Sequence, residues 1–155
     1  MSFLKNLFGR KDEGKPVEPI FPGESFRIFK LNLPDGWGLA SANKAYDNYA
    51  NKAIYGWHVL VELEVINKND NGHPINEEAL RLTQLEDKIK IFLGQTQTVH
   101  FVARITRNGF RNLLFYIDKP TISQEQLTTF CDEVMKEKKL PSSFPPQVRL
   151  RHKLF

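Results

Sequence analysis

The dipeptide Asn108-Gly109 lies between two apolar runs, at residues 99–107 and 110–117. Asn-Gly between such runs is the strongest short signal for a β-hairpin, because both central residues of a type I′ turn need positive φ. We therefore expect two antiparallel strands that pair outward from Arg107 opposite Phe110. Few local patterns restrict the fold of a chain this strongly.

This pairing divides the side chains of the hairpin between two faces of a sheet. The first face, which suits a surface beneath helices, holds Val99, Phe101, Ala103, Ile105, Leu114 and Tyr116. The second face holds His100, Val102, Arg104, Leu113, Phe115 and Ile117. Because the second face is too apolar for contact with water, we expect another part of the chain to cover it.

Periodicity predicts the elements on either side of the hairpin. Residues 57–65 alternate like a strand, and residues 77–93 carry apolar side chains at helical spacing, with Asn76 as a candidate cap and Gly94 as a candidate end. The order strand, helix, strand, strand, helix, strand is completed by two C-terminal elements. It predicts an α+β fold of the ferredoxin-like βαββαβ type, an antiparallel sheet with two helices on one face.

The two C-terminal elements rest on separate signals. Ser123 and Gln126 have the spacing of a capping box, which marks the start of a helix. Residues 148–154 alternate apolar and basic side chains, as expected of a charged edge strand.

The N-terminal part is divided by composition. Residues 1–23 contain an amphipathic segment and a linker rich in proline and glycine, and residues 24–155 are expected to form a single α+β domain. Residues 25–33 alternate like a strand, and residues 39–53 show helical spacing. We expect the aromatic side chains of residues 20–50 to form a strand and helix layer that covers the second face of the hairpin.

The basic charge of the chain is concentrated at its ends. The net charge is +4, of which residues 1–15 carry +2 and residues 147–155 carry +3, so residues 16–146 carry −1. A nucleic-acid-binding surface needs a basic footprint on the folded body. The charge distribution therefore disfavours a nucleic-acid partner.

An RNA-binding surface is nevertheless an alternative for the second face of the hairpin. RNA-recognition modules stack bases on aromatic side chains of their strands, and Phe115 with Arg104 and His100 is the candidate platform. Glu62 and Glu64 of the preceding strand would repel phosphate there. We therefore favour an internal cover for this face.

The sequence also bears on the compartment. Cys131 is the single cysteine, and no apolar run reaches the roughly 18 residues of a membrane span. The opening residues lack the pattern of a secretory signal, so a cytoplasmic location is expected. Residues 3–11 could make a weak peripheral contact with an anionic membrane, or dock on the domain itself or on a second copy. The oligomeric state stays open.

The sequence contains no convincing catalytic or metal-binding pattern. The four histidines lack the spacing of a metal site, and no catalytic residue or cofactor is predicted. His73, Glu77 and Glu78 at a helix start, and His58 on a strand with Glu62, are the candidates for acid–base work or ligand binding. Carboxylates on a helix more often form a solvated face, so an enzyme is only the alternative hypothesis.

Arginines around the hairpin turn complete the candidate binding residues. These are Arg104, Arg107 and Arg111. Arginines in such a place commonly form a solvated rim, but they also suit the binding of anions.

Three stretches together resemble a known family. They are "SANKAYDNYANKAIYGWHVLVELEV", "DNGHPINEEALRLTQLEDKI" and "ARITRNGFRNLLFYID". They resemble an uncharacterised bacterial family, domain of unknown function 695, over roughly residues 35–140. The family pattern has proline where this chain has Gly56.

The resemblance has limited implications for function. The family has no established activity, but some members resemble, or are fused with, a domain similar to regulator B, a protein inhibitor of ribonuclease E. This implies a regulatory binding module that acts on a protein partner. We therefore expect a non-enzymatic binding or regulatory domain, with a small-molecule enzyme or an RNA-binding module as alternatives.

Overall fold

The computed structural model describes residues 20–137 and 144–152 of the 155-residue chain. The amphipathic stretch at residues 3–11 lies outside these ranges. Six strands, two α-helices and two short 3₁₀ segments make up the described part: β1 (Phe26–Leu33), β2 (Gly36–Asn43), η1 (Lys44–Asn48), η2 (Lys52–Ile54), β3 (Trp57–Glu64), α2 (Glu78–Gly94), β4 (Val99–Arg107), β5 (Phe110–Ile117), α3 (Gln124–Glu137) and β6 (Gln147–His152).

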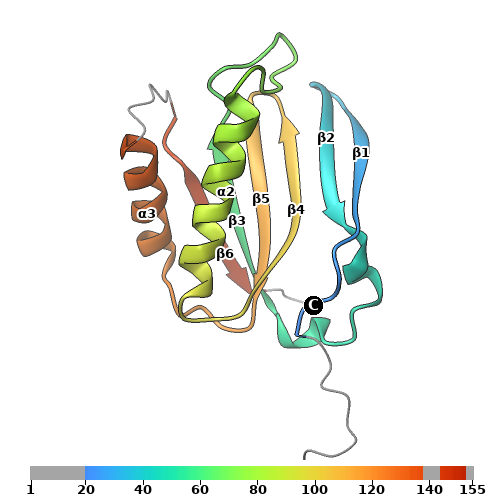
Figure 1. The fold of residues 1–155 in the computed structure, drawn as a ribbon, viewed down its shortest axis with the longest axis vertical. Helices are drawn as coiled ribbons and strands as arrows, with labels where there is room; N and C mark the ends of the chain where they lie inside the picture. The colour runs from blue at the N-terminus through green and yellow to red at the C-terminus, as the bar shows by residue number, and fades with distance from the viewer. Residues whose placement is uncertain (1–19, 138–143, 153–155) are drawn as a thin grey trace, which may run out of the picture.

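The strands form one antiparallel sheet in the order β1-β2-β4-β5-β3-β6. The helices α2 and α3 lie against one face of this sheet, over its central and β6 side (Figure 1). The α+β class is therefore confirmed. The strand order differs from that of a four-stranded ferredoxin-like sheet, because β1 and β2 extend the sheet beyond β4.

The hydrophobic core lies between the helices and strands β3 and β5. Alternate residues of β3 face it, and a stripe of α2 residues packs on them, as the spacing of both segments predicts. The fully buried members include Val59, Val61, Leu63, Leu82, Leu85, Ile89, Leu113, Phe115, Ile117 and Leu127. Cys131 is buried in the same cluster as a small apolar side chain, and this burial raises the pKa of its thiol to about 12.

The hairpin turn is confirmed at Asn108-Gly109. Arg107 pairs with Phe110, and the two turn residues have φ values of 50° and 82°. Further along, the ladder contains an irregularity between Phe101 and Ala103, where β4 carries one extra residue.

The expected assignment of the two hairpin faces is wrong for β5 and for the part of β4 after Phe101. Leu113, Phe115 and Ile117 lie beneath the helices, in the core, and are not covered by residues 20–50. Val99 and Phe101 do lie on the helix side, as expected, because the extra residue between Phe101 and Ala103 places them on the same face as Arg104 and Thr106. A bulge of this kind has no signature in the alternation of the sequence.

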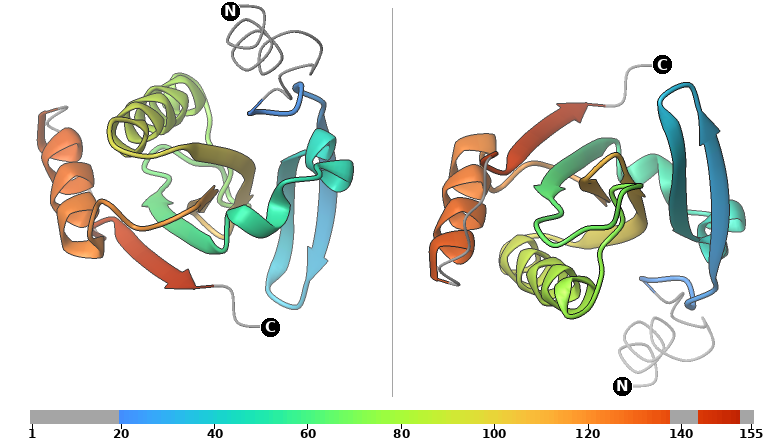
Figure 2. Two further views of the ribbon diagram at one scale, coloured as in Figure 1. Left: turned by 90° about the horizontal axis from the view of Figure 1, so that it is seen from below. Right: turned by 90° about the horizontal axis from the view of Figure 1, so that it is seen from above.

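The expected helix at residues 39–53 is also wrong. Residues 36–43 form β2, which pairs with β1 through a tight turn at Pro34-Asp35, and only short 3₁₀ segments follow. An Asp-Gly pair is itself a hairpin signal, and Gly36 has a φ of 134°. The β1–β2 hairpin therefore forms the far edge of the sheet, beyond the helices, and not a separate layer (Figure 2).

The capping predictions have mixed outcomes. Ser123 and Gln126 form the capping box: the Gln126 amide donates to the Ser123 hydroxyl at 3.1 Å, and the Ser123 amide donates to the Gln126 side chain at 2.8 Å. Helix α2 ends at Gly94 as expected. Asn76 does not cap α2, which begins at Glu78, and takes a positive φ of 54° in the preceding loop. Within the described residues, no helix is long and apolar enough to cross a membrane.

Candidate functional site

A cavity of about 340 Å³ lies between the β1–β2 hairpin and the central sheet, on the same face as the helices. We refer to it as the arginine cavity. Its polar lining comprises Ser41 of β2, His73 of the loop before α2, Arg104 and Thr106 of β4, and Arg111 of β5. The register places these side chains together, because Ser41 pairs with Arg104 and Thr106 pairs with Arg111.

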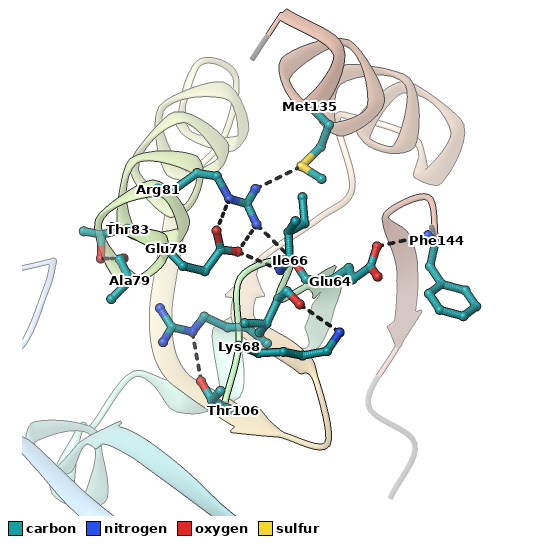
Figure 3. A network of polar contacts seen from close by, with 12 residues as sticks. Glu64, Ile66, Lys68, Glu78, Ala79, Arg81, Thr83, Thr106, Met135 and Phe144 are labelled. Atoms are coloured by element: carbon teal, nitrogen blue, oxygen red, sulfur yellow. Dashed lines mark hydrogen bonds and ion pairs between the residues drawn. The ribbon is translucent and has the colours of Figure 1, made fainter. Parts of the chain in front are cut away.

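Arg111 is the most unusual residue of this cavity. Its side chain is on the core face of β5, and the residue is only 9% exposed. Its Nε donates to the Thr106 hydroxyl at 2.9 Å, the contact that reaches Thr106 in Figure 3. Among the described residues, the two terminal nitrogens of its guanidinium have no hydrogen-bond partner. These terminal nitrogens are not fully buried, so they reach the open cavity, and the charge has lost only part of its water.

The electrostatic surroundings do not compensate this charge. Burial lowers the pKa of Arg111, and the nearby positive charge of Arg104 lowers it further, while Glu86 and Glu78 act in the opposite direction. The positive charge of Arg81 also lowers the pKa of Arg111. Two arginines and two glutamates around Arg111 balance one another, so the charge of Arg111 itself faces the cavity without a counterion among these groups.

Arg104, in contrast, is paired. Its Nε and one terminal nitrogen donate to the two oxygens of Glu86 on α2, at 2.9 and 2.6 Å, and its other terminal nitrogen lies 3.4 Å from the Ser41 hydroxyl. These bonds to Glu86 raise the pKa of Arg104. Glu86 is 1% exposed and also approaches Lys90 at 3.6 Å. The pair ties α2 to β4 and leaves one edge of Arg104 towards the cavity.

A second buried ion pair joins Glu78 and Arg81 in the first turn of α2 (Figure 3). The Glu78 carboxylate accepts from Arg81 and, at 2.9 Å, from the backbone amide of Ile66. Arg81 also donates to the backbone carbonyl of Glu64 at 3.1 Å. The first turn of α2 is thereby joined to the end of β3, which positions the loop that carries His73.

His73 and Trp37 close the turn end of the cavity. Their rings stack at 4.2 Å with an angle of 21°, and the ammonium of Lys30 lies 5.1 Å from the Trp37 ring on its hairpin. His73 is buried, and its Nε2 has no hydrogen-bond partner among the described residues. The stack is a contact between the β1–β2 hairpin and the loop before α2.

The structure brings three of the seven candidate binding residues together: His73, Arg104 and Arg111 line the arginine cavity. The other four lie elsewhere. Arg107 is exposed at the hairpin turn, Glu77 is exposed at the start of α2, His58 lies beside Tyr116 on the opposite face, and Glu78 is held by Arg81.

The residues of the alternative hypotheses are also separated. Phe115 is fully buried beneath the helices, and His100 lies on the other face of the sheet, so the platform with Arg104 is not assembled. In the acid–base alternative, both oxygens of Glu78 are engaged by Arg81. Within the described residues, no group of three or more His, Cys, Asp or Glu side chains could hold a metal ion.

Sequence reasoning missed a second hollow, of about 310 Å³, on the face opposite the helices. We refer to it as the tyrosine hollow. Tyr46, Tyr49, Tyr55 and Tyr116 line it around His100, which is 1% exposed. The four tyrosines come from the 3₁₀ region and from β5. Tyr46 and Tyr49 belong to the aromatic residues expected to form a covering layer, and Tyr116 belongs to the first face of the hairpin.

A family model describes most of this chain. The family of unknown function DUF695 matches residues 28–142, a range that runs from within β1 to the end of α3 and contains all residues of the arginine cavity. The chain belongs to this family. The resemblance seen in the sequence is thereby confirmed. Searches of curated proteins and of solved structures gave no match.

Proposed function

We propose that this domain is a binding module for a small oxyanion, either a carboxylate or a phosphate, held in the arginine cavity by Arg111. The observation that carries the proposal is the buried Arg111 guanidinium, whose terminal nitrogens are left without partners by the described residues. A planar guanidinium with two parallel free donors matches the two oxygens of such a group.

The neighbours of Arg111 support the same ligand. Thr106 fixes the Nε edge of the guanidinium, which leaves the opposite edges free to bind, and Arg104 and Ser41 present further donors to the same cavity. Glu86 and Glu78 are occupied by Arg104 and Arg81, so they do not compete for Arg111. The cavity volume is also in the range of small-molecule sites.

The groups that line the arginine cavity favour a binding function over a catalytic one. An acid–base reaction needs a titratable group free to exchange a proton near the substrate. In the arginine cavity the cations are arginines, which keep their protons, and the nearby carboxylates are engaged in ion pairs. The titratable His73 is stacked on Trp37, and its Nε2 is buried. This arrangement supports a non-enzymatic binding domain.

We also propose that β3 to β6, with α2 and α3, correspond to a ferredoxin-like unit to which the β1–β2 hairpin adds one wall of the site. The support is the partial order β4-β5-β3-β6, with one helix between β3 and β4 and the other between β5 and β6. A ligand in the cavity would contact both the hairpin and the central sheet. A regulatory role in the cytoplasm, through a protein partner that senses this contact, is part of the proposal.

The test is a titration of the protein with acetate and with inorganic phosphate, followed by amide chemical shifts in ¹H–¹⁵N spectra. We expect saturable shifts at Thr106 and Arg111, and at least a tenfold weaker affinity for Arg111→Lys, which keeps the charge but loses the paired donors. Arg107→Ala is the matched control, because Arg107 is an exposed arginine of the same hairpin outside the cavity. If neither ion shifts these signals, or if both variants weaken binding equally, the proposal fails.

A further inference from the structure

The wall of the arginine cavity formed by the β1–β2 hairpin is apolar. Ile28 of β1 and Trp37 and Leu39 of β2 line it, and the register places Ile28 opposite Ser41 on the face that carries the helices. Ile28 is 74% exposed and Leu39 is 38% exposed. Among the described residues, the cavity therefore combines a cationic floor with an apolar wall that is open to water.

The two parts of the cavity lie side by side on the sheet. Arg111 of β5 pairs with Thr106 of β4, Thr106 pairs with Leu39 of β2, and Ile28 of β1 lies diagonally beside Leu39, opposite Ser41. Neighbouring strands in a sheet are about 4.8 Å apart. Leu39 is directly opposite Thr106 in the ladder. A ligand that bound Arg111 with one end would thus extend over Leu39 towards Ile28.

We propose that the ligand class of the arginine cavity is a small amphipathic carboxylate, with its carboxylate on Arg111 and an aliphatic chain along Leu39 and Ile28. This inference rests on the proposed function, because it needs the anion at Arg111. It adds the apolar body, its direction and the residues that contact it.

The surrounding charges fit one anionic end and an uncharged chain. Arg104 is saturated on two sides by Glu86 and offers a single edge to the cavity, so one carboxylate suffices to use the free donors. Ile28 and Leu39 carry no polar group, and the ammonium of Lys30, the ladder partner of Leu39, lies 5.1 Å from the Trp37 ring. A chain along them would cover apolar surface that now faces water, which is favourable in proportion to the area.

The chain-length dependence of affinity tests the inference. We would titrate the protein with acetate, butyrate and hexanoate, and with hexylamine as a cation that has a chain of similar length. Each buried methylene contributes about 0.8 kcal/mol, which corresponds to about a fourfold lower Kd per added methylene. Hexanoate should therefore bind much more tightly than acetate, and hexylamine should not displace it.

Two variants separate this inference from the proposed function. Ile28→Ser changes an exposed side chain and should weaken hexanoate binding about fivefold while leaving acetate binding unchanged. Arg111→Lys should weaken both. If acetate and hexanoate bind the parent equally, or Ile28→Ser weakens neither, the amphipathic ligand is wrong although the oxyanion site stands. If no carboxylate binds, both proposals are wrong.

Discussion

The hydroxyl of Tyr46 lies 2.8 Å from Nδ1 of His100, on the face of the sheet opposite α2 and α3. The ring centroid of Tyr55 lies 4.0 Å from that of the same imidazole, and the ring centroid of Phe21 lies 4.9 Å from it. Burial raises the pKa of Tyr46 to about 12, so its hydroxyl keeps its proton at neutral pH. Burial also lowers the pKa of His100, and the charge of Asp118 opposes this only in part.

This arrangement predicts a pH dependence of stability. Because the folded protein holds His100 neutral, the unfolded chain takes up a proton more readily as the pH falls below about 6.5. The contribution of His100 is therefore complete above that pH and decreases as the pH falls towards the lower pKa of the folded state. Urea denaturation between roughly pH 5 and pH 7.5 should show a steeper loss for the parent than for His100→Gln. His58→Gln serves as the control, and equal slopes for parent and His100→Gln would contradict the prediction.

The second prediction concerns the hairpin turn. Gly109→Val should lower the free energy of unfolding by about 2 kcal/mol or more, because a β-branched residue is strained at a φ of 82°. The strain is conformational, since the atoms nearest to a Cβ at this position belong to the flexible side chain of Lys68, at 3.4 Å. Gly94→Ala is the matched control: apart from its chain neighbours and the backbone of its own helix, its Cβ would meet no atom of the described residues within 4 Å. Equal melting temperatures for parent and Gly109→Val would show that the turn tolerates side chains.

The hairpin also shows how far the sequence constrains the fold. Asn108-Gly109 and the Ser123–Gln126 capping box are local signals, and both are confirmed because their physics acts within a few residues. The stripe of apolar residues on α2 is confirmed for the same reason. Spacing alone predicts a helix for residues 39–53, whereas the tertiary pairing of β2 with β4 makes residues 36–43 a strand.

The site was only partly accessible from sequence. Arginines near the hairpin turn were suspected, but their roles depend on the face each one occupies: Arg111 is buried, Arg104 is paired and Arg107 is exposed. His73 reaches the same cavity through a loop whose path is set by long-range contacts, including the Ile66 amide bound to Glu78. Contacts between segments that are far apart in the sequence cannot be predicted from local periodicity.

The third prediction concerns the core. Phe115→Ala should lower the free energy of unfolding by roughly 3–5 kcal/mol, the range for truncation of a buried phenylalanine. Phe115 is fully buried beneath the helices, where its ring contacts Phe101 at 5.3 Å. Ile91→Ala, at a 68% exposed position on α2, should change stability little. A chemical denaturation curve for each variant measures the difference, and similar losses for both would mean that Phe115 is not part of the core.

The last prediction compares the two arginines of the cavity. Arg104→Met removes the partner of Glu86, which is 1% exposed, and leaves that carboxylate with only Lys90 at 3.6 Å. We expect a loss of roughly 3 kcal/mol in the free energy of unfolding, at the lower end of the range for an unpaired buried charge because Lys90 remains. Raising the salt concentration should not restore it, since the carboxylate stays buried.

Arg111→Met should behave in the opposite way. It removes a buried charge that makes a single hydrogen bond, to Thr106, so the cost of burying that charge disappears together with the bond. We expect stability equal to or greater than that of the parent, together with loss of acetate binding. Urea denaturation of both methionine variants, with acetate titrations of Arg111→Met, measures the contrast. If Arg111 has only a structural role, Arg111→Met should destabilise the protein as much as Arg104→Met. A stable Arg111→Met protein that no longer binds acetate would instead place Arg111 in a binding site that stability does not require.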